Sequence, residues 1–365
     1  MESEVAVAKV KYVKNGVQDA VKKAMTLANW TKHVNIKKDG KLFLKINGIS
    51  DHLVPGQVTS PWVLEGVLQE IRRVYPNCQL SIGDANLAAY SQLHEAATLW
   101  GFKDLCAKYN ARFVNLSEDE LLPVKIPNGK IVKDLELPKT LVDADAIITM
   151  PVAKTHFLTQ ITCSIKNQWG CIPVFRHQFH VVADKMLADI NSYLKKITFV
   201  VCDMTVCMEG NAPRTGIPKI CDMVIASHDR VAVDSAVATY MGLDPKKIGS
   251  IMECEDSGVG TSNFKLIGEE MGVNLFKPPR GDRQPIYIIE MTLRKIPIIK
   301  NLVFDTPLFY LGAAGATWYN KVWWYNLKGK KYAKDILENT WYGKEEFAPL
   351  LKISRAQNRQ MHSSH

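Results

Sequence analysis

The sequence predicts a layered α/β fold, in which a mostly parallel or mixed sheet is flanked by helices and a basic, aromatic appendage follows. Three observations predict this fold. Short apolar runs rich in β-branched residues alternate with longer segments whose apolar residues recur at helical spacing. The 365 residues are 47% hydrophobic and 23% charged, which is typical of globular proteins and excludes disordered or collagen-like chains. This length suggests two lobes, or one large domain with an appendage.

The first elements in chain order are a helix, a strand and a second helix. Residues 15–30 carry apolar side chains on one stripe, which indicates an amphipathic helix. The apolar run 42–46 indicates a strand. Ser60 and Pro61 supply an N-cap and a first-turn proline, so we expect a helix from there to about residue 75.

The same alternation continues through the rest of the chain. Residues 79–82 form an apolar run that Gly83 and Asp84 end, which indicates a strand. Pro151 ends a later strand in the same way. The remaining expected elements are a helix at 93–109, an extended segment at 112–115, a strand at 146–150, a helix at 182–194, strands at 198–202 and 223–226, and helices at 232–241 and 246–254.

Positive charge and aromatic side chains gather at the C-terminal end. Residues 277–365 hold 15 of the 46 basic, 7 of the 37 acidic and 13 of the 32 aromatic residues, so residues 1–276 are almost neutral. We therefore expect an α/β body at 1–276, with a division into two lobes near 150–195 left open, and a basic aromatic extension at 277–365. The longest uncharged apolar stretch, 306–320, is shorter than the roughly 20 residues that span a bilayer.

The N-terminus and the cysteines predict a cytoplasmic protein. Glu2 and Glu4 stand where a secretory signal has basic residues, and no apolar run follows them. The eight cysteines are scattered without a C-x-x-C pair, so the sequence shows neither a zinc ribbon nor a ferredoxin motif. Reduced thiols are the simplest interpretation. The sequence assigns no cofactor.

Polar residues follow the first predicted strand, at a position where open α/β sheets bind ligands. Lys45 and Asn47 finish that strand, and Thr59 and Ser60 precede the next helix. Two hydroxyl groups and the free amides of a helix start are suited to an anion. The alternative is that Thr59 and Ser60 only cap the helix.

A second polar cluster follows Pro151. Lys154 and His156 stand two residues apart in an extended segment, on either side of Thr155, so their side chains point to the same face. A lysine beside a histidine suits an anionic substrate and a proton transfer near neutral pH. The alternative is an ordinary solvated or packed histidine.

The densest polar region runs from Lys154 to His180 and contains three histidines, two lysines and an arginine. Lys166, Asn167 and Arg176 belong to it. Cations that converge with few neighbouring acids favour a carboxylate, a phosphate or an enolate. The three histidines lack the spacing of a zincin helix, so no metal is predicted.

A further cluster follows the strand at 198–202. Asp203 finishes that strand, and Glu209 and Asn211 flank a tight turn at Gly210. An acid in this position supplies a general base or orients a lysine. The alternative is that Asp203 caps the next turn and Gly210 only supplies a positive φ.

Several catalytic motifs are absent from the sequence. It contains no P-loop, no G-x-G-x-x-G after the first strand, no G-x-S-x-G elbow and no H-E-x-x-H. Nucleotide kinases, nicotinamide enzymes of the Rossmann type, serine hydrolases and zincins are therefore not predicted.

Taken in order, these segments resemble the family described as domain of unknown function 362, over roughly residues 5–272. The resemblance rests on Lys45-Ile46-Asn47 (Lys-Pro-Asn in the family), Thr59-Ser60-Pro61, Ile82-Gly83-Asp84, Pro151-Val152-Ala153-Lys154-Thr155-His156, Lys166-Asn167-Gln168-Trp169-Gly170, His180, Asp203, Met208-Glu209-Gly210-Asn211-Ala212-Pro213 and Asp229 to Asp234. The resemblance implies a fold and a site but no reaction. Family members often carry a ferredoxin-like module with two four-iron clusters, which this cysteine-free extension lacks. A looser, fold-level likeness is to lactate-racemase-like proteins, whose lysines and histidines handle a 2-hydroxy acid.

The sequence thus predicts an enzyme that acts on a small anionic substrate bearing a carboxylate or a phosphate. Lys45, Lys154 and Lys166 would hold charge, and His156 or His180 would move a proton. Asp203 or Glu209 would orient or assist these groups. The expected reaction is proton abstraction, elimination, isomerisation or reduction.

Two other classes of function stay open. An oxidoreductase with an iron–sulfur cluster or an organic cofactor is one, although the spacings of Cys163, Cys171, Cys202 and Cys207 match no cluster motif. The other is a non-catalytic binding or accessory protein at a membrane surface, because the tryptophans and lysines of the extension resemble an interfacial anchor. A lid or an arm of a homodimer is the alternative for that extension. Nucleic acid is not expected, because no recognised binding module is visible.

Overall fold

The computed structural model describes residues 2–87, 92–172, 176–279, 296, 314–315 and 318–350. Within these residues the strands of the main sheet are β1 (Ser3–Lys9), β2 (Lys41–Ile46), β3 (Gln79–Asp84), β4 (Arg112–Asn115), β7 (Ala146–Met150), β8 (Val152–His156), β9 (Gln160–Thr162), β10 (Ile197–Glu209), β11 (Ile217–Ser227) and β12 (Phe264–Gly268). A separate antiparallel pair consists of β5 (Leu121–Lys125) and β6 (Asp134–Pro138).

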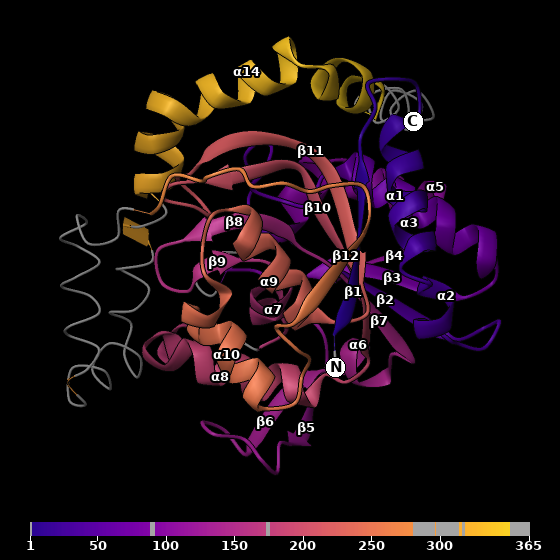
Figure 1. Cartoon of the computed structure of the whole chain (residues 1–365), viewed down its shortest axis with the longest axis vertical. Helices are drawn as coiled ribbons and strands as arrows, with labels where there is room; N and C mark the ends of the chain where they lie inside the picture. The colour runs from indigo at the N-terminus through magenta and orange to yellow at the C-terminus, as the bar shows by residue number, and fades with distance from the viewer. Residues whose placement is uncertain are drawn as a thin grey trace, which may run out of the picture.

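Helices cover both faces of the main sheet (Figure 1). Those of the body are α1 (Gly16–Leu27), α2 (Trp30–His33), α3 (Pro61–Val74), α4 (Leu93–Leu99), α5 (Phe102–Lys108), α6 (Lys139–Asp143), α7 (Ser164–Asn167), η1 (Gln168–Cys171), η2 (Arg176–Val182), α8 (Ala183–Tyr193), α9 (Arg230–Tyr240), η3 (Pro245–Lys247) and α10 (Gly249–Asp256). Those of the extension are η5 (Tyr319–Gly329), α14 (Lys330–Asn339) and η6 (Tyr342–Phe347). The predicted α/β fold class is confirmed.

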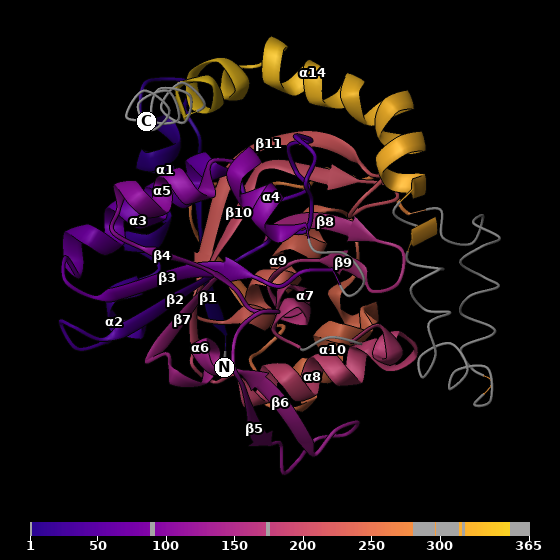
Figure 2. The same cartoon turned by 180° about the vertical axis from the view of Figure 1, so that it is seen from behind.

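The order of the strands reverses between β2 and β7. The main path of the sheet is β12-β1-β11-β10-β7-β2-β3-β4, and β10, β7, β2, β3 and β4 all run parallel. From β2 the chain builds outward through β3 and β4, then returns to the other side of β2 with β7. The helices are divided between the two faces of the sheet. Helices α1, α3 and α5 cover one face, and α8, α9 and α10 cover the other (Figures 1 and 2). Open α/β sheets bind ligands beyond the carboxyl ends of the strands at such a point.

Most predicted elements are present, with revised ends. The single helix expected at 93–109 is two helices, because Gly101 takes a left-handed φ of 73° between α4 and α5. The helix expected at 246–254 begins at Gly249, after the turn η3. Strands β10 and β11 run well beyond 198–202 and 223–226, since they pair with each other along most of their length. The strands on either side of 150–195 share one sheet.

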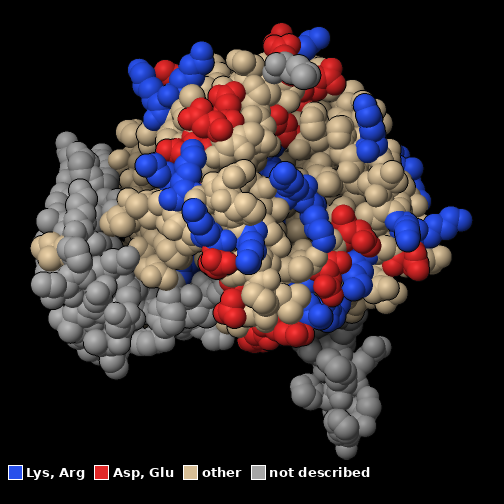
Figure 3. Space-filling model, turned by 90° about the horizontal axis from the view of Figure 1, so that it is seen from below, with Lys and Arg blue, Asp and Glu red and all other residues tan. Residues whose placement is uncertain are grey.

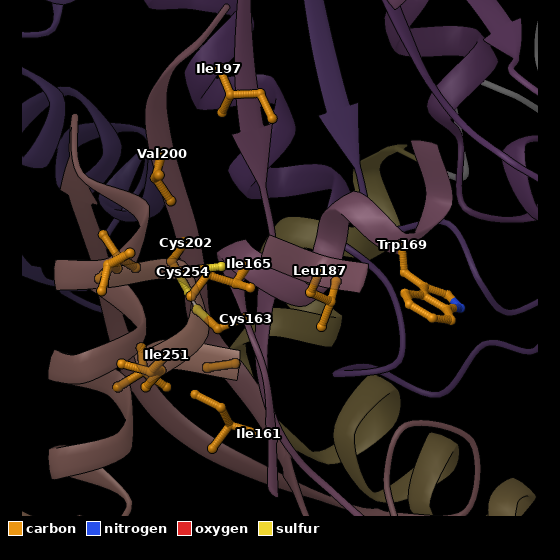
Figure 4. Packing of buried hydrophobic residues seen from close by; sticks show 14 of the residues in the cluster. Ile161, Cys163, Ile165, Trp169, Leu187, Ile197, Val200, Cys202, Ile251 and Cys254 are labelled. Carbon is orange, nitrogen blue, oxygen red and sulfur yellow. Dashed lines mark hydrogen bonds between the residues drawn. The ribbon is translucent and has the colours of Figure 1, made fainter. Parts of the chain in front are cut away.

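The core contains all four cysteines that were candidates for a cluster, and Cys254 with them. Cys163, Cys202 and Cys254 lie among Ile161 and Ile251 in the close view of Figure 4. The sulfur atoms of Cys163 and Cys202 are 3.5 Å apart. All eight cysteines of the chain are buried and free of disulfides. They pack as small apolar side chains.

The surface of the body carries mixed charge. In the view from below, lysine and arginine side chains are interspersed with aspartate and glutamate over the described surface (Figure 3). This distribution is what the nearly neutral count for residues 1–276 predicts. No single large field of one sign covers the described part of this face (Figure 3).

The described part of the extension arches over the edge of the body (Figure 1). Trp324 packs with Val54 and Met208, and the ring of Tyr342 stacks on that of Trp62 with centroids 5.6 Å apart. One face of the extension is thus fixed to the body. No helix in the described ranges is long and apolar enough to cross a membrane. Most of the predicted apolar stretch 306–320 lies outside the described residues.

Candidate functional site

A buried ion pair joins the ends of β2 and β3. The Lys45 Nζ atom lies 2.6 Å from Asp84 Oδ1, and neither side chain is exposed. Asp84 also accepts the backbone N–H groups of Gly48 and Ala85, at 2.7 and 2.8 Å. With both partners fixed in this way, the pair forms a rigid floor beside the point where the strand order reverses.

The backbone of Gly170 lies against this ion pair. A Cβ atom at residue 170 would stand 2.2 Å from Asp84 Oδ1 and 3.0 Å from Lys45 Nζ. A glycine is therefore required for the chain to approach so closely. The approach brings the polar segment that begins with Lys166 over the strand ends.

Lys154 forms the second part of the floor. Its ammonium donates to Asn47 Oδ1 at 3.1 Å and to the Gln57 carbonyl at 2.6 Å. Burial lowers the pKa of Lys154 to about 7, against the opposing effects of Asp203 and Asp84. Lys154 is thus charged in only part of the population at neutral pH.

Two asparagine amides tie the strand ends to the segment above them. Asn167 donates to the Lys45 carbonyl at 3.0 Å and to Thr149 Oγ1 at 2.9 Å. The amide of Asn47 reaches Asn167 Oδ1 at 3.4 Å. Both predicted binding residues, Asn47 and Asn167, therefore position the lysines.

The predicted anion site at the start of α3 holds the protein's own carboxylate. The Ser60 backbone N–H donates to Asp203 Oδ2 at 2.8 Å, and the Thr59 hydroxyl donates to the Met150 carbonyl at 2.7 Å. Asp203 Oδ1 accepts the N–H and the hydroxyl of Thr205. Burial raises the pKa of Asp203, and these hydrogen bonds oppose the rise. These residues form an internal cap, and their predicted roles as a base or as substrate contacts stay predictions.

His156 is a neutral ring with a defined tautomer. Its Nδ1 atom accepts the backbone N–H groups of Leu158 and Thr159, at 3.0 and 3.3 Å, so the ring proton is assigned to Nε2. Burial, and then the charges of Lys166 and Lys154, lower the pKa of His156 well below its ordinary value. At neutral pH His156 is therefore a hydrogen-bond donor. The hydroxyl of Thr155 is already bound to the Gly210 carbonyl at 2.8 Å.

Lys166 is the lysine of the cluster that stays partly exposed. Its ammonium lies 4.5 Å from the ring centroid of Trp169, and that ring stacks on His180 at 5.5 Å. Dense surroundings and then the charge of Arg176 lower the pKa of Lys166 to about 7, whereas Asp184 raises it. An amine that is half neutral near pH 7 and reaches solvent can exchange protons with a ligand.

Three buried donor groups, which lie beside Lys166 or beside the loop at Asn86, have no hydrogen-bond partner among the described residues. They are Arg176 Nε, Trp169 Nε1 and Gln92 Nε2. Arg176 and Gln92 reach the same loop, because Arg176 donates to the Asn86 carbonyl at 2.6 Å and Gln92 accepts the N–H of Leu87 at 3.2 Å. Unpaired buried donors are costly unless a ligand accepts from them. The arrangement favours an anionic ligand.

Two acids that sequence analysis did not assign to the site support the Lys166 segment. Asp234 accepts the backbone N–H groups of Ser164 and Ile165 at 2.7 and 3.2 Å, which caps α7, and burial raises its pKa to about 6. Asp184 stands close enough to Lys166 to raise its pKa, and burial raises the pKa of Asp184 itself. The start of α10 touches this carboxylate, since a Cβ on Gly249 would lie 2.2 Å from Asp184 Oδ2.

Glu209 and Asn211 have other partners. The Glu209 carboxylate lies 3.2 Å from the Lys219 ammonium and 3.0 Å from that of Lys277. The Asn211 carbonyl accepts the N–H and the hydroxyl of Thr215. Within the described chain, the partners of the Glu209 carboxylate are Lys219 and Lys277, not Lys154 or Lys166. Glu209 ties the start of the extension to the body, and its catalytic role stays a prediction.

In the described part of the chain, no group of three His, Cys, Asp or Glu side chains converges as a metal site would need. The iron–sulfur alternative stays a prediction. Iron and sulfide analysis of anaerobically purified protein would decide it.

Comparisons with known proteins give a family match and distant likenesses. The family model described as domain of unknown function 362 matches residues 42–239. A Synechocystis sp. protein described as thylakoid-associated is 28% identical over 142 residues, which cover 36% of this chain and 43% of that protein. The chain thus aligns with less than half the length of this curated relative.

Two solved structures are similar over about two thirds of the chain. The lactate racemase apoprotein from Thermoanaerobacterium thermosaccharolyticum has a TM-score of 0.43 and 17% identity, covering 67% of this chain and 58% of that one. A protein from Thermotoga maritima has a TM-score of 0.38 and 12% identity, covering 64% and 60%.

Proposed function

Because this chain belongs to the family described as domain of unknown function 362, whose description names no reaction, we propose a function from the site itself. The protein is an enzyme that binds a small carboxylate or phosphate at the carboxyl ends of β2 and β7 and moves a proton with Lys166. One observation carries the proposal. Two buried donors without acceptors, Arg176 Nε and Trp169 Nε1, neighbour an accessible lysine whose pKa is lowered to about 7.

Binding follows from the unpaired donors. An anionic oxygen accepts from Arg176 Nε and Trp169 Nε1, which removes the cost of leaving those groups unpaired in the protein interior. Lys45 and Lys154 stay beneath the ligand as a rigid floor, held by Asp84, Asn47 and the Gln57 carbonyl. We expect a small ligand, because the donors Arg176 and Trp169 lie on short segments that are close in the sequence.

Proton transfer follows from the two neutral groups. The Lys166 amine accepts a proton from the carbon beside the carboxylate, and the electron pair of the C–H bond moves into an enediolate. The Nε2–H of His156 and the guanidinium of Arg176 stabilise the oxygen on which negative charge develops. Return of the proton from the lysine restores the substrate, whereas protonation of the opposite face by solvent, after which Lys166 releases its proton to solvent, completes an isomerisation. Departure of a group on the next carbon, with the same electron pair forming the double bond, completes an elimination.

Exchange of substrate hydrogen for solvent deuterium tests this proposal without knowledge of the product. The protein is incubated in D2O with glycolate, lactate, malate and phosphoglycolate, and loss of the C–H signal is followed by proton NMR. We expect exchange with at least one of these acids, and loss of that exchange in Lys166→Gln. Lys185→Gln is the matched control, because Lys185 is an exposed lysine on α8. Full exchange in Lys166→Gln, or no exchange with any acid, would reject the assignment.

Anion binding is measured separately. Arg176→Gln should weaken the binding of the same acids about tenfold or more in calorimetric titrations, because it removes a buried cation that faces the ligand. Unchanged affinity in this variant would place the anion elsewhere. Binding without exchange would instead make the protein a carrier of the anion.

A further inference from the structure

The outer face of the extension exposes a group of large apolar side chains. Five such residues stand within ten positions at the start of this helical arm: Trp318 (60% exposed), Tyr319 (41%), Val322 (47%), Trp323 (46%) and Leu327 (61%). Trp324, in the middle of the same run, is only 5% exposed. The difference between Trp324 and its neighbours shows that the exposed apolar side chains lie on one face of the helix.

The geometry of η5 keeps these side chains together. Its wide turns bring residues four and five positions apart onto the same side, and the rings of Tyr319 and Trp323 are stacked at 5.1 Å. The opposite side is fixed, because Trp324 packs with Val54 and Met208 of the body. The segment therefore cannot turn its aromatic face inward without losing that packing.

Positive charge continues along the same arm. No aspartate or glutamate occurs between Trp318 and Lys334, and the following turns expose lysines. Lys328, Lys330, Lys331 and Lys334 are all exposed. An aromatic patch followed by a lysine row has the chemistry of a surface that meets a lipid headgroup layer, in which indole and phenol rings lie at the interface and lysines face phosphates.

We infer that the outer face of η5 and the first turn of α14 docks on an anionic lipid bilayer. Trp318, Trp323 and Leu327 enter the headgroup region, and the lysines contact lipid phosphates. Charge complementarity favours this occupant, because η5 and the first turn of α14 carry lysines and no acidic residue, whereas many protein surfaces mix both signs. Docking is peripheral. The inference does not depend on the proton-transfer function of the body.

Vesicle sedimentation of the full chain tests the inference. The wild type should co-sediment with vesicles of phosphatidylcholine that contain one third phosphatidylglycerol. Much less protein should co-sediment with vesicles of pure phosphatidylcholine. The triple variant Trp318→Ser, Trp323→Ser, Leu327→Ser should lose about tenfold or more in binding, because it removes the apolar contact. The control Val273→Ser changes a residue that is 65% exposed on the body and should bind like the wild type.

A second pair of variants separates charge from apolar contact. Lys330→Gln with Lys331→Gln should weaken binding to the anionic vesicles by about fivefold for each lysine. The pair Lys246→Gln with Lys247→Gln makes the same change of charge on η3 and should leave binding unchanged.

Three outcomes would overturn the inference. They are no sedimentation of the wild type, equal sedimentation of the wild type and the triple serine variant, and a wild-type dimer in analytical ultracentrifugation that the triple variant abolishes. The last would show that a second copy of the chain covers this face.

Discussion

The Lys45 ammonium lies 2.6 Å from the Asp84 carboxylate, and the two residues stand at the ends of neighbouring parallel strands. Both side chains are buried, so each charge relies on the other for compensation. The pair is a constraint as well as a source of charge. It fixes the distance between the ends of β2 and β3 beneath the Lys166 segment.

Loss of Lys45 should therefore be far more damaging than loss of the whole pair. Lys45→Met leaves the Asp84 carboxylate buried and uncompensated, and we expect a loss of about 3–5 kcal/mol in the free energy of unfolding. Adding Asp84→Asn should restore a large part of this loss, because the amide is neutral and keeps an oxygen for Gly48 or Ala85. Urea denaturation measures both variants. A single variant within 1 kcal/mol of the wild type would contradict the prediction.

Asp203 is expected to act on stability and not on the reactivity of Lys166. In Asp203→Asn an amide replaces one carboxylate oxygen, and if that amide faces the Ser60 N–H, two donors meet. We expect a loss of about 1–3 kcal/mol of stability, measured by urea denaturation. The chemical labelling of Lys166 described next should keep its wild-type midpoint. A shifted midpoint with unchanged stability would return Asp203 to the catalytic group.

Lys166 should react as a neutral amine near pH 7. Competitive labelling with acetic anhydride between pH 5 and pH 10, read by mass spectrometry, reports the fraction of each lysine that is neutral. The pKa of Lys166 is lowered to about 7, so its labelling should rise through that pH. The labelling of an ordinary solvated lysine should rise near pH 10. A Lys166 midpoint above 9 would remove the proposed base.

Lys154 should make stability depend on pH in alkaline solution. Its pKa is about 7 in the folded protein and about 10.4 in the unfolded chain, so the unfolded chain binds more protons between these values. Stability conferred through this residue therefore rises as the pH rises from 7 to 10. Compared with Lys154→Met, the wild type should gain up to about 4 kcal/mol over this window in urea titrations. Parallel curves for the two proteins would show that Lys154 is not perturbed.

The fold was predictable from local pattern because buried parallel strands such as β7 and β2 are short, mostly apolar runs with clear ends. Strand β10 was predicted too short, since Asp203 and Thr205 interrupt its apolar run and their burial depends on partners 143 positions away. The same limit applies to the site. The sequence shows Lys45, Lys154 and Lys166 as cations near strand ends. It does not show which of these lysines is buried and which reaches solvent.

The residues that were missed share this long-range character. Asp84 ends a predicted strand, and that position was the available signal, yet its partner Lys45 is set by the sheet register. Gln92 and Asp184 carry no motif, and they join the site only through the packing of α4 and α8 around it. The two-faced character of η5 likewise depends on where Trp324 packs.

Glu209 should control the attachment of the extension. The Gly210 N–H donates to the Lys277 carbonyl at 2.9 Å, and the Glu209 carboxylate binds both the backbone N–H and the ammonium of Lys277. Burial alone would raise the pKa of Glu209, but the hydrogen bonds from Lys277 and Lys219 outweigh it, and the pKa is lowered. A carboxyl group whose pKa is lowered by folding stabilises the folded state at any pH above its ordinary pKa, near 4.3. This stability is lost as the pH falls through the lowered pKa of the folded state.

Hydrogen–deuterium exchange of the Gly210 amide follows this attachment directly. In the wild type, after correction for intrinsic rates, protection should persist from pH 7 to about pH 5 and fall below the ordinary carboxyl pKa, because protonated Glu209 no longer holds the two lysines. In Glu209→Gln the amide should be less protected at every pH. Glu269→Gln, which removes a carboxylate paired with Lys23, is the matched control and should leave Gly210 unchanged. Equal protection in all three proteins would mean that packing of Trp324 and Tyr342 alone holds the extension on the body.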